Sequence, residues 1–188
     1  MNKTKVKLVS NCTTCDCFNI IKNEYPELGG SYEVLHHSVF LQQLINSGRL
    51  KINGGGEFKG KTITFHDSCY LGRSNNIYEA PREILEALDA DLVEMKSCKT
   101  NGLCCGAGGG HAWLEENQGT RINHMRTDQF LETGADTVAV SCPFCLQMFD
   151  EGLSSRDESK KRKAVDLIEL IDQSTSVPQE KLGKDGPT

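Results

Sequence analysis

The chain has 188 residues, of which 37% are hydrophobic, and its formal net charge at pH 7 is −5. This length suffices for one globular domain and part of a second, and the hydrophobic share is enough to build a core. The negative charge argues against nucleic acid as a partner, and the chain has no apolar run of roughly 18 residues that could span a membrane.

Nine cysteines are spread along the sequence. Their number is odd and residues 1–4 do not resemble an export signal, so reduced thiols are favoured over a disulfide framework. Reduced thiols place the protein in the cytoplasm, or on the cytoplasmic face of a membrane complex. Thiols that stay reduced are also available as metal ligands.

The first part of the chain predicts two strand–helix units. The expected elements are a strand over 6–9, a helix over 18–25 that stops before Pro26, a strand over 32–36 and a helix from Ser38 to about Gly48. Three cysteines, Cys12, Cys15 and Cys17, follow the first strand. The glycines at 54–56 predict a linker over 53–56.

The second part continues the alternation. The expected elements are a strand over 62–65, a helix after Pro81, a strand over 92–95, a helix over about 120–132 that stops at Gly134, a strand over 138–140, a helix opened by residues 142–145, a loop over 154–163, a helix over 167–171 and a polar tail from Gln173. Strands alternating with helices indicate an α/β fold with a mainly parallel sheet and helices on both faces.

An internal repeat divides the chain. Residues 8–19 echo residues 138–147, and residues 40–45 echo residues 165–171. We therefore expect residues 1–55 to be the second half of a domain whose complete copy occupies 56–175, followed by a disordered tail over 176–188. An upstream segment or a partner chain would complete the first copy.

Five of the cysteines form one arrangement. Each lies just after a predicted strand or in a loop: Cys69, the adjacent pair Cys104 and Cys105, and Cys142 with Cys145. Carboxyl ends of parallel strands share one sheet edge, so these thiols are expected to converge there. An adjacent pair cannot easily direct both sulfurs at a single ion but suits a multi-iron cluster. Zinc, which also prefers thiolates, and plain core packing are the alternatives.

Other residues near these cysteines have several possible roles. His66, Asp67, Gly106, Gly108 and His111 are expected to surround the metal, with the glycines bringing backbone N–H groups close to sulfur. For His66 and Asp67 the alternative is a strand-end cap in which the aspartate bonds loop amides. Trp113 is expected in the core, and Cys98 is expected away from the metal. His36 and His37 are expected to lie in a strand-to-helix connection, with metal ligands or a substrate-side acid as the alternative roles.

At these residues the chain resembles the cysteine-rich CCG domain found in heterodisulfide reductases and in the iron–sulfur subunits of glycolate and lactate oxidases. The family pattern is a Cys, a long gap, Cys-Cys-Gly, a second long gap and Cys-Pro-x-Cys. It is met by Cys69, by residues 104–106 and by residues 142–145. The segments His66–Arg73 and Gly106–Trp113 fit as well.

The resemblance implies that the five cysteines hold a [4Fe–4S] cluster, of the cubane or the noncubane type. It implies an oxidoreductase subunit that passes electrons from a flavoprotein or ferredoxin-type partner to a disulfide or quinone-linked acceptor, together with an upstream iron–sulfur or CCG portion and a possible membrane complex. The alternatives are the iron–sulfur subunit of a 2-hydroxy-acid oxidase and a zinc-stabilised interaction domain. The chain departs from the family pattern at residues 15–17. Cys12, Cys15 and Cys17 would therefore bind zinc, join a cluster completed elsewhere, or remain free thiols without a metal.

Overall fold

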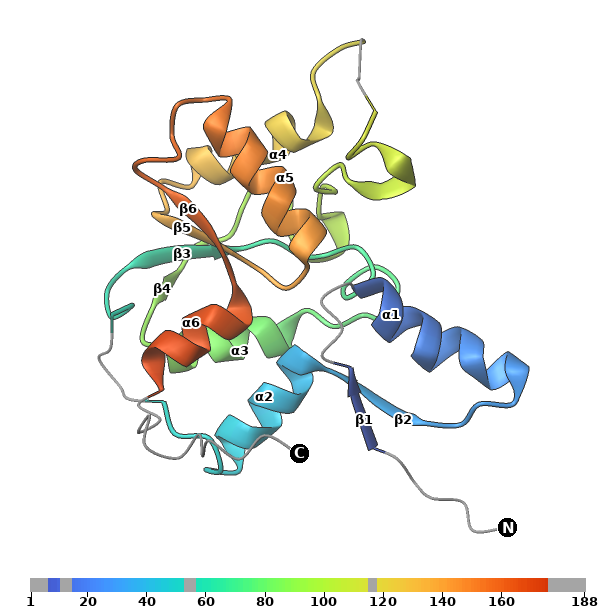
Figure 1. The fold of residues 1–188 in the computed structure, drawn as a ribbon. Coiled ribbons are helices and arrows are strands. Elements are labelled where there is room, and N and C mark those ends of the chain that lie inside the picture. Colours follow the sequence, from blue (N-terminus) through green and yellow to red (C-terminus); the bar gives the residue numbers. More distant parts are fainter. Residues whose placement is uncertain (1–6, 11–14, 53–56, 115–117, 176–188) are drawn as a thin grey trace, which may run out of the picture.

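The computed structural model describes residues 7–10, 15–52, 57–114 and 118–175, and its centre is a four-stranded parallel sheet (Figure 1). The strands stand in the order β4-β3-β5-β6, with β3 at Thr62–Phe65, β4 at Asp91–Leu92, β5 at Thr137–Val140 and β6 at Lys163–Asp166. All four residues of β5 are buried, as a central parallel strand requires. The predicted α/β fold with a parallel sheet is confirmed.

Helices cover both faces of the sheet. The core on one face is built mainly with α4 (Ile122–Glu132) and α5 (Pro143–Ser154), and the core on the other with α3 (Glu79–Ala87) and α6 (Leu167–Ser174). Phe130 and Phe149 lie at the centre of the first core, and Phe65 and Leu170 in the second. The expectation of helices on both faces is therefore confirmed.

A smaller unit precedes this domain. Its strands β1 (Lys7–Ser10) and β2 (Glu33–His36) are parallel, and its helices are α1 (Cys15–Asn19) and α2 (His37–Asn46). The prediction of a single helix over 18–25 is wrong: α1 passes into a π turn over Ile20–Glu24 and a 3₁₀ turn over Tyr25–Leu28. Pro26 lacks the N–H that an α-helix needs, and Gly29 ends the turn in the left-handed region, at φ 83°.

The two units repeat at a constant offset. Strands β5 and β6 begin at 137 and 163, and each begins 130 residues after its counterpart, β1 at 7 and β2 at 33. Even the strand register repeats, since Lys7 pairs with Glu33 as Thr137 pairs with Lys163. The helix caps follow the same offset, because His36 caps α2 and Asp166 caps α6. The predicted echo of 40–45 in 165–171 is therefore shifted by a few residues.

Side-chain hydrogen bonds join the two units. Gln42 of α2 donates to Glu83 of α3 at 2.5 Å, and Asn75 donates to Asn19 of α1 at 2.9 Å. The partly buried Leu41 and Ile45 also pack against the core that contains α3. The N-terminal unit thus lies against the helix that follows the first cysteine loop.

Two further predictions need correction. The strand expected over 92–95 is only Asp91–Leu92, because Glu94 turns away to bind Arg82. The last helix extends to Ser174, so the expected polar tail does not begin at Gln173. The linker at 53–56 and the tail at 176–188 lie outside the described residues. Among the helices that are described, none combines the length and apolar character needed to cross a membrane.

Candidate metal centre

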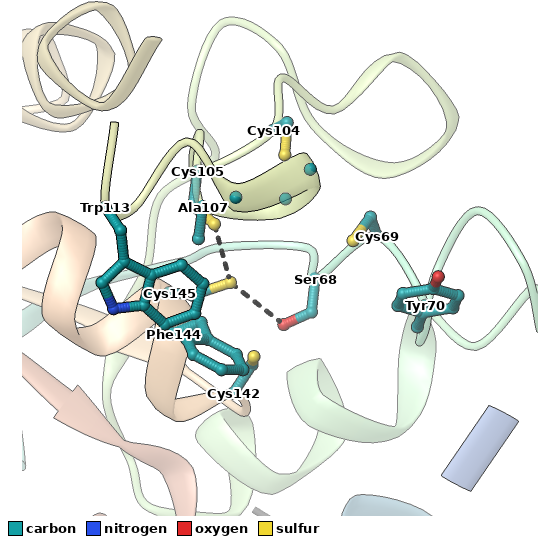
Figure 2. A pocket seen from close by; sticks show the side chains of 13 residues that line it. Ser68, Cys69, Tyr70, Cys104, Cys105, Ala107, Trp113, Cys142, Phe144 and Cys145 are labelled. Carbon is teal, nitrogen blue, oxygen red and sulfur yellow. Dashed lines mark hydrogen bonds between the residues drawn. The ribbon is translucent and has the colours of Figure 1, made fainter. Parts of the chain in front are cut away.

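Five cysteines from three separate loops line one cavity at the carboxyl edge of the sheet (Figure 2). Cys69 follows β3, Cys104 and Cys105 lie between β4 and α4, and Cys142 and Cys145 open α5. The cavity has a volume of about 260 Å³. The structure therefore brings together all five residues that the sequence selected as ligands, at the edge where parallel strands end. Their ligation of a metal stays a prediction.

The five sulfur atoms form a continuous series of contacts. The Sγ atoms of Cys105 and Cys145 lie 3.3 Å apart. Cys69 and Cys105 hydrogen-bond to Cys104, and Cys145 also hydrogen-bonds to Cys142. Each residue is a thiol rather than half of a disulfide. Cys105, Cys142 and Cys145 are buried, whereas Cys69 and Cys104 are half-buried and face the open side.

This crowding makes the thiols hard to ionise together. Hydrogen bonds from Cys105 and Cys69 lower the pKa of Cys104, so its thiolate forms first. The hydrogen bond to that thiolate raises the pKa of Cys105 to about 12, and it also raises the pKa of Cys69. The hydrogen bonds to Cys105 and Cys142, followed by burial, raise the pKa of Cys145. Without a cation, negative charge is confined to one sulfur; a bound metal would compensate several.

Backbone N–H groups point at the sulfurs. The Gly106 N–H donates to Cys104 Sγ at 3.4 Å, and the backbone groups of Tyr70 and Ala107 bond Cys69 and Cys105. Gly106 adopts φ 91°, and a Cβ there would lie 3.0 Å from Asn123 N and from Ile122 Cβ. Only glycine therefore suits this position, both for its backbone angle and for the close approach of α4.

The mouth of the cavity carries aromatic and glycine residues. Gly108 and Tyr70 line it, and Trp113 lies edge-on to Phe144 with ring centroids 6.0 Å apart. The prediction that Trp113 anchors the core is wrong, because its side chain is 74% exposed. His111 is not among the residues that line the cavity.

Asp67 holds the loops together below the cysteines. Both of its carboxylate oxygens accept from Arg82, at 2.9 and 3.0 Å, and Oδ2 also accepts from the backbone N–H of Lys99 at 2.6 Å. Arg82 binds Glu94 at 2.6 Å with its Nε. Lys99 begins the segment that leads to Cys104, so Asp67 has the loop-bonding role that was one of its two expected roles.

His66 lies beside two of the cysteines. One of its ring nitrogens and the Sγ atoms of Cys105 and Cys145 all lie within 4.8 Å of one another. Its Nδ1 accepts from the Nε of Arg126 at 3.1 Å. The sequence analysis missed Arg126, Arg82 and also Ser68, whose Oγ lies 3.9 Å from Cys145 Sγ. Only Ser68 could have been found from the sequence, because it directly precedes Cys69.

The remaining candidates lie outside the cavity. Cys98 is half-buried and, as expected, is not among the lining residues. His36 ends β2, and its Nδ1 accepts from Ser38 N at 3.2 Å, so it has the predicted place in a strand-to-helix connection. Cys12 and the side chain of Cys15 lie outside the described residues, and Cys17 is half-buried in α1. Zinc in the N-terminal lobe stays a prediction.

The donor set fits an iron–sulfur cluster. Clusters are held by cysteine thiolates and are tuned by N–H groups that donate to sulfur, and both features are present here. The five cysteines line one shared cavity, which is larger than the coordination site of a single ion. The half-buried Cys69 and Cys104 leave one side accessible to solvent or to a partner.

Comparison with known proteins finds a matching cysteine-rich family and relatives that are named as oxidoreductases. Residues 63–150 match the family described as CCG, cysteine-rich domain. The chain is 43% identical to a probable iron-sulfur-binding oxidoreductase, FadF, of Bacillus subtilis over 89% of this chain and 23% of that protein. It is 40% identical to the EtfAB:quinone oxidoreductase of Syntrophomonas wolfei over 82% of this chain and 22% of that protein.

A third relative is one subunit of a larger enzyme. The dihydromethanophenazine:CoB–CoM heterodisulfide reductase of Methanosarcina barkeri has a subunit that is 37% identical over 82% of this chain and 38% of that subunit. The chain thus spans about a quarter of the first two relatives and somewhat over a third of this one.

Proposed function

Because residues 63–150 belong to the family of cysteine-rich CCG domains, we propose that the chain is an iron–sulfur electron-transfer module of an oxidoreductase. The ligands would be Cys69, Cys104, Cys105, Cys142 and Cys145, and the cofactor a [4Fe–4S] cluster. The observation that carries the proposal is the convergence of these five thiols on one cavity. An adjacent cysteine pair within the set favours a multi-iron cluster over a single ion.

The bound cluster supplies one-electron redox chemistry, and the protein controls its surroundings. Cys105, Cys142 and Cys145 are buried, so this side of the site excludes water. The N–H of Gly106 donates to Cys104 and offsets negative charge on sulfur. Cys69 and Cys104 are half-buried, and we infer that electrons enter or leave on their side.

We further propose that the donor is a flavoprotein and the acceptor is quinone-linked. The relative from Syntrophomonas wolfei is named for EtfAB and quinone, and its identity to this chain, 40%, exceeds the 37% of the Methanosarcina barkeri relative named for a heterodisulfide. A disulfide acceptor, a ferredoxin-type donor and the 2-hydroxy-acid oxidase assembly are the competing assignments. All of them use the same module with different partners.

A zinc-stabilised domain without redox activity is the second candidate function. It is favoured by the three-residue group of His66, Cys105 and Cys145, whose ligand atoms lie within 4.8 Å of one another. Zinc is bound by sulfur and imidazole ligands of this kind.

The deciding experiment is purification of the 188-residue chain without oxygen, followed by assays of iron, acid-labile sulfide and zinc. Iron and sulfide in equal amounts, with a spin-resonance signal after reduction, would support the electron-transfer module. Stoichiometric zinc without sulfide would overturn it. A signal that changes when thiol or disulfide is added would favour a disulfide acceptor over a quinone-linked one.

A further inference from the structure

His66 is held rigidly at the floor of the cysteine site. It directly follows β3, its backbone N–H donates to Ala139 O at 2.9 Å, and its ring lies edge-on to Phe149 with centroids 5.2 Å apart. The side chain is 1% exposed. One ring nitrogen lies within 4.8 Å of the Cys105 and Cys145 sulfurs. The ring therefore has a fixed orientation beside two of the proposed ligands.

The tautomer of His66 is set by Arg126. A guanidinium group only donates hydrogen bonds, so the Nδ1 that accepts from Arg126 Nε at 3.1 Å carries no proton. The ring is therefore neutral, with its proton on Nε2. The Nδ1 lone pair is used by Arg126, and the protonated Nε2 has no lone pair, so His66 cannot bind a metal in this state.

Arg126 is a buried cation without a carboxylate partner in the described part of the chain. It is 1% exposed, and its acceptors are His66 Nδ1, Ser97 O at 2.7 Å and Gln129 Oε1 at 2.6 Å. Its Nη2 is buried with no hydrogen-bond partner among the described residues. Asp67, the nearby acid, is occupied by Arg82. An uncompensated buried charge is strongly destabilising, so a counter-charge is needed.

A metal-loaded cysteine site would supply that counter-charge. Burial lowers the pKa of Arg126, and Asp67 and Cys98, followed by Cys145 and Cys105, act against that shift. Thiolates around a cluster carry net negative charge, and that charge grows when the cluster is reduced. A cation fixed behind the cysteines, away from the open side at Cys69, would therefore stabilise the reduced state more than the oxidised one.

We propose that Arg126 and His66 are positioning residues that raise the reduction potential of the cluster. Arg126 fixes the orientation and tautomer of the His66 ring beside the sulfur site and adds a buried positive charge next to that ring. This inference rests on the proposed function and deepens it, because it assigns residues outside the cysteine motif to control of the same centre. It also separates this site from a zinc site that uses His66 as a ligand.

The test is an anaerobic redox titration of the 188-residue chain, followed by spin resonance. Arg126→Met removes the charge, Arg126→Lys keeps the charge but loses the hydrogen-bonding fork, and His66→Gln removes the ring. The expected result is a more negative midpoint potential in Arg126→Met and His66→Gln and a smaller shift in Arg126→Lys, with iron and sulfide content unchanged. Arg156→Met, which removes a surface partner of Asp128, is the matched control and should leave the potential unchanged.

The outcomes separate this inference from the proposed function. A wild-type chain without iron and sulfide would overturn both. A loaded wild type whose potential does not move in Arg126→Met and His66→Gln would overturn the inference alone, and so would loss of the cluster from all three variants, which would indicate a role in folding. If only Arg126→Met loses the cluster, the midpoint potential of His66→Gln decides: a more negative value supports the inference, and an unchanged value overturns it. Pulsed spin resonance on protein with ¹⁵N-labelled histidine adds a check, because strong coupling, as for a ligand, would contradict the assignment of His66 as a non-ligand.

Discussion

The Sγ atoms of Cys105 and Cys145 lie 3.3 Å apart although the two residues are 40 positions apart in the sequence. One comes from a glycine-rich loop and the other from the first turn of α5, so their contact depends on the whole sheet edge being in place. Both are buried, and they form the closed side of the cavity. Mutations at this pair and at the residues that support it therefore test the site most directly.

Replacing Cys104 or Cys105 by Ala should abolish cluster binding. Cys104 accepts hydrogen bonds from two neighbouring thiols, and Cys105 connects it to Cys145, so neither sulfur has a substitute. Iron and sulfide assays on protein purified without oxygen measure the loss. Cys98→Ala is the control and should retain the cluster, because Cys98 does not line the cavity. Iron retained in the Cys104 and Cys105 variants would show that these two cysteines are not ligands.

Gly106→Ala should destabilise the chain by more than its backbone angle alone explains. A left-handed conformation costs a non-glycine residue about 1–2 kcal/mol, and here the new methyl would also press on Asn123 and Ile122 at 3.0 Å. The matched control is Gly60→Ala, since Gly60 has φ 68° and nothing within 4 Å of a Cβ. Urea unfolding measures both. Equal losses in the two variants would contradict the close-packing argument.

Asp67→Asn should cost about 3–5 kcal/mol, because it leaves Arg82 buried with only Glu94 as a charged partner. It should also loosen the segment that begins at Lys99, whose N–H loses a charged acceptor. Glu79→Gln is the control: it breaks an exposed pair with Lys99, which solvent screens, and should cost little stability. Thermal unfolding of the metal-free protein compares them, and similar losses would mean that Asp67 has no special role.

The sequence was sufficient for three of the four strands of the sheet, the five cysteines and the repeat, because each leaves a local signal. Strand β6 (Lys163–Asp166) was missed, since its residues follow a charged, loop-like segment. Strand β5 is a short apolar run, and the cysteine motif has fixed spacings. The constant offset of 130 residues shows that the repeat was identified correctly but aligned imperfectly in its second part, where only a loose apolar pattern was available.

The residues that sequence reasoning missed act across long separations. Arg126 reaches His66 from 60 positions away, and nothing in the α4 sequence distinguishes it from a surface arginine of an amphipathic helix. Trp113 was placed in the core because tryptophan usually is buried, whereas the structure leaves it exposed at the rim of the cavity. Tertiary contacts, rather than local patterns, decide both cases.

Acid should destabilise the metal-free chain through two buried histidines of the N-terminal unit. Burial lowers the pKa of His36 to about 3 and that of His37 to about 4, from an ordinary value of 6.5. Between pH 6.5 and these lowered pKa values the unfolded chain binds more protons than the folded chain. The stability present above pH 6.5 is therefore lost as the pH falls toward 4. His37→Gln should reduce the stability lost between pH 6.5 and pH 4 by about 3 kcal/mol at most, and so flatten the dependence on pH. Urea unfolding at several pH values measures it, and an unchanged slope would contradict the prediction.

Binding of a cluster should quench the fluorescence of Trp113. It is the single tryptophan of the chain, and it lines the cavity that the five cysteines share (Figure 2). Iron–sulfur clusters absorb light across the range in which tryptophan emits, so energy transfer over this short separation is efficient, whereas zinc absorbs no visible light. Emission should therefore fall as iron and sulfide are reconstituted into the metal-free protein and recover when a chelator removes them. Trp113→Phe should abolish the signal, and emission that stays constant during verified cluster loading would place the cluster away from this cavity.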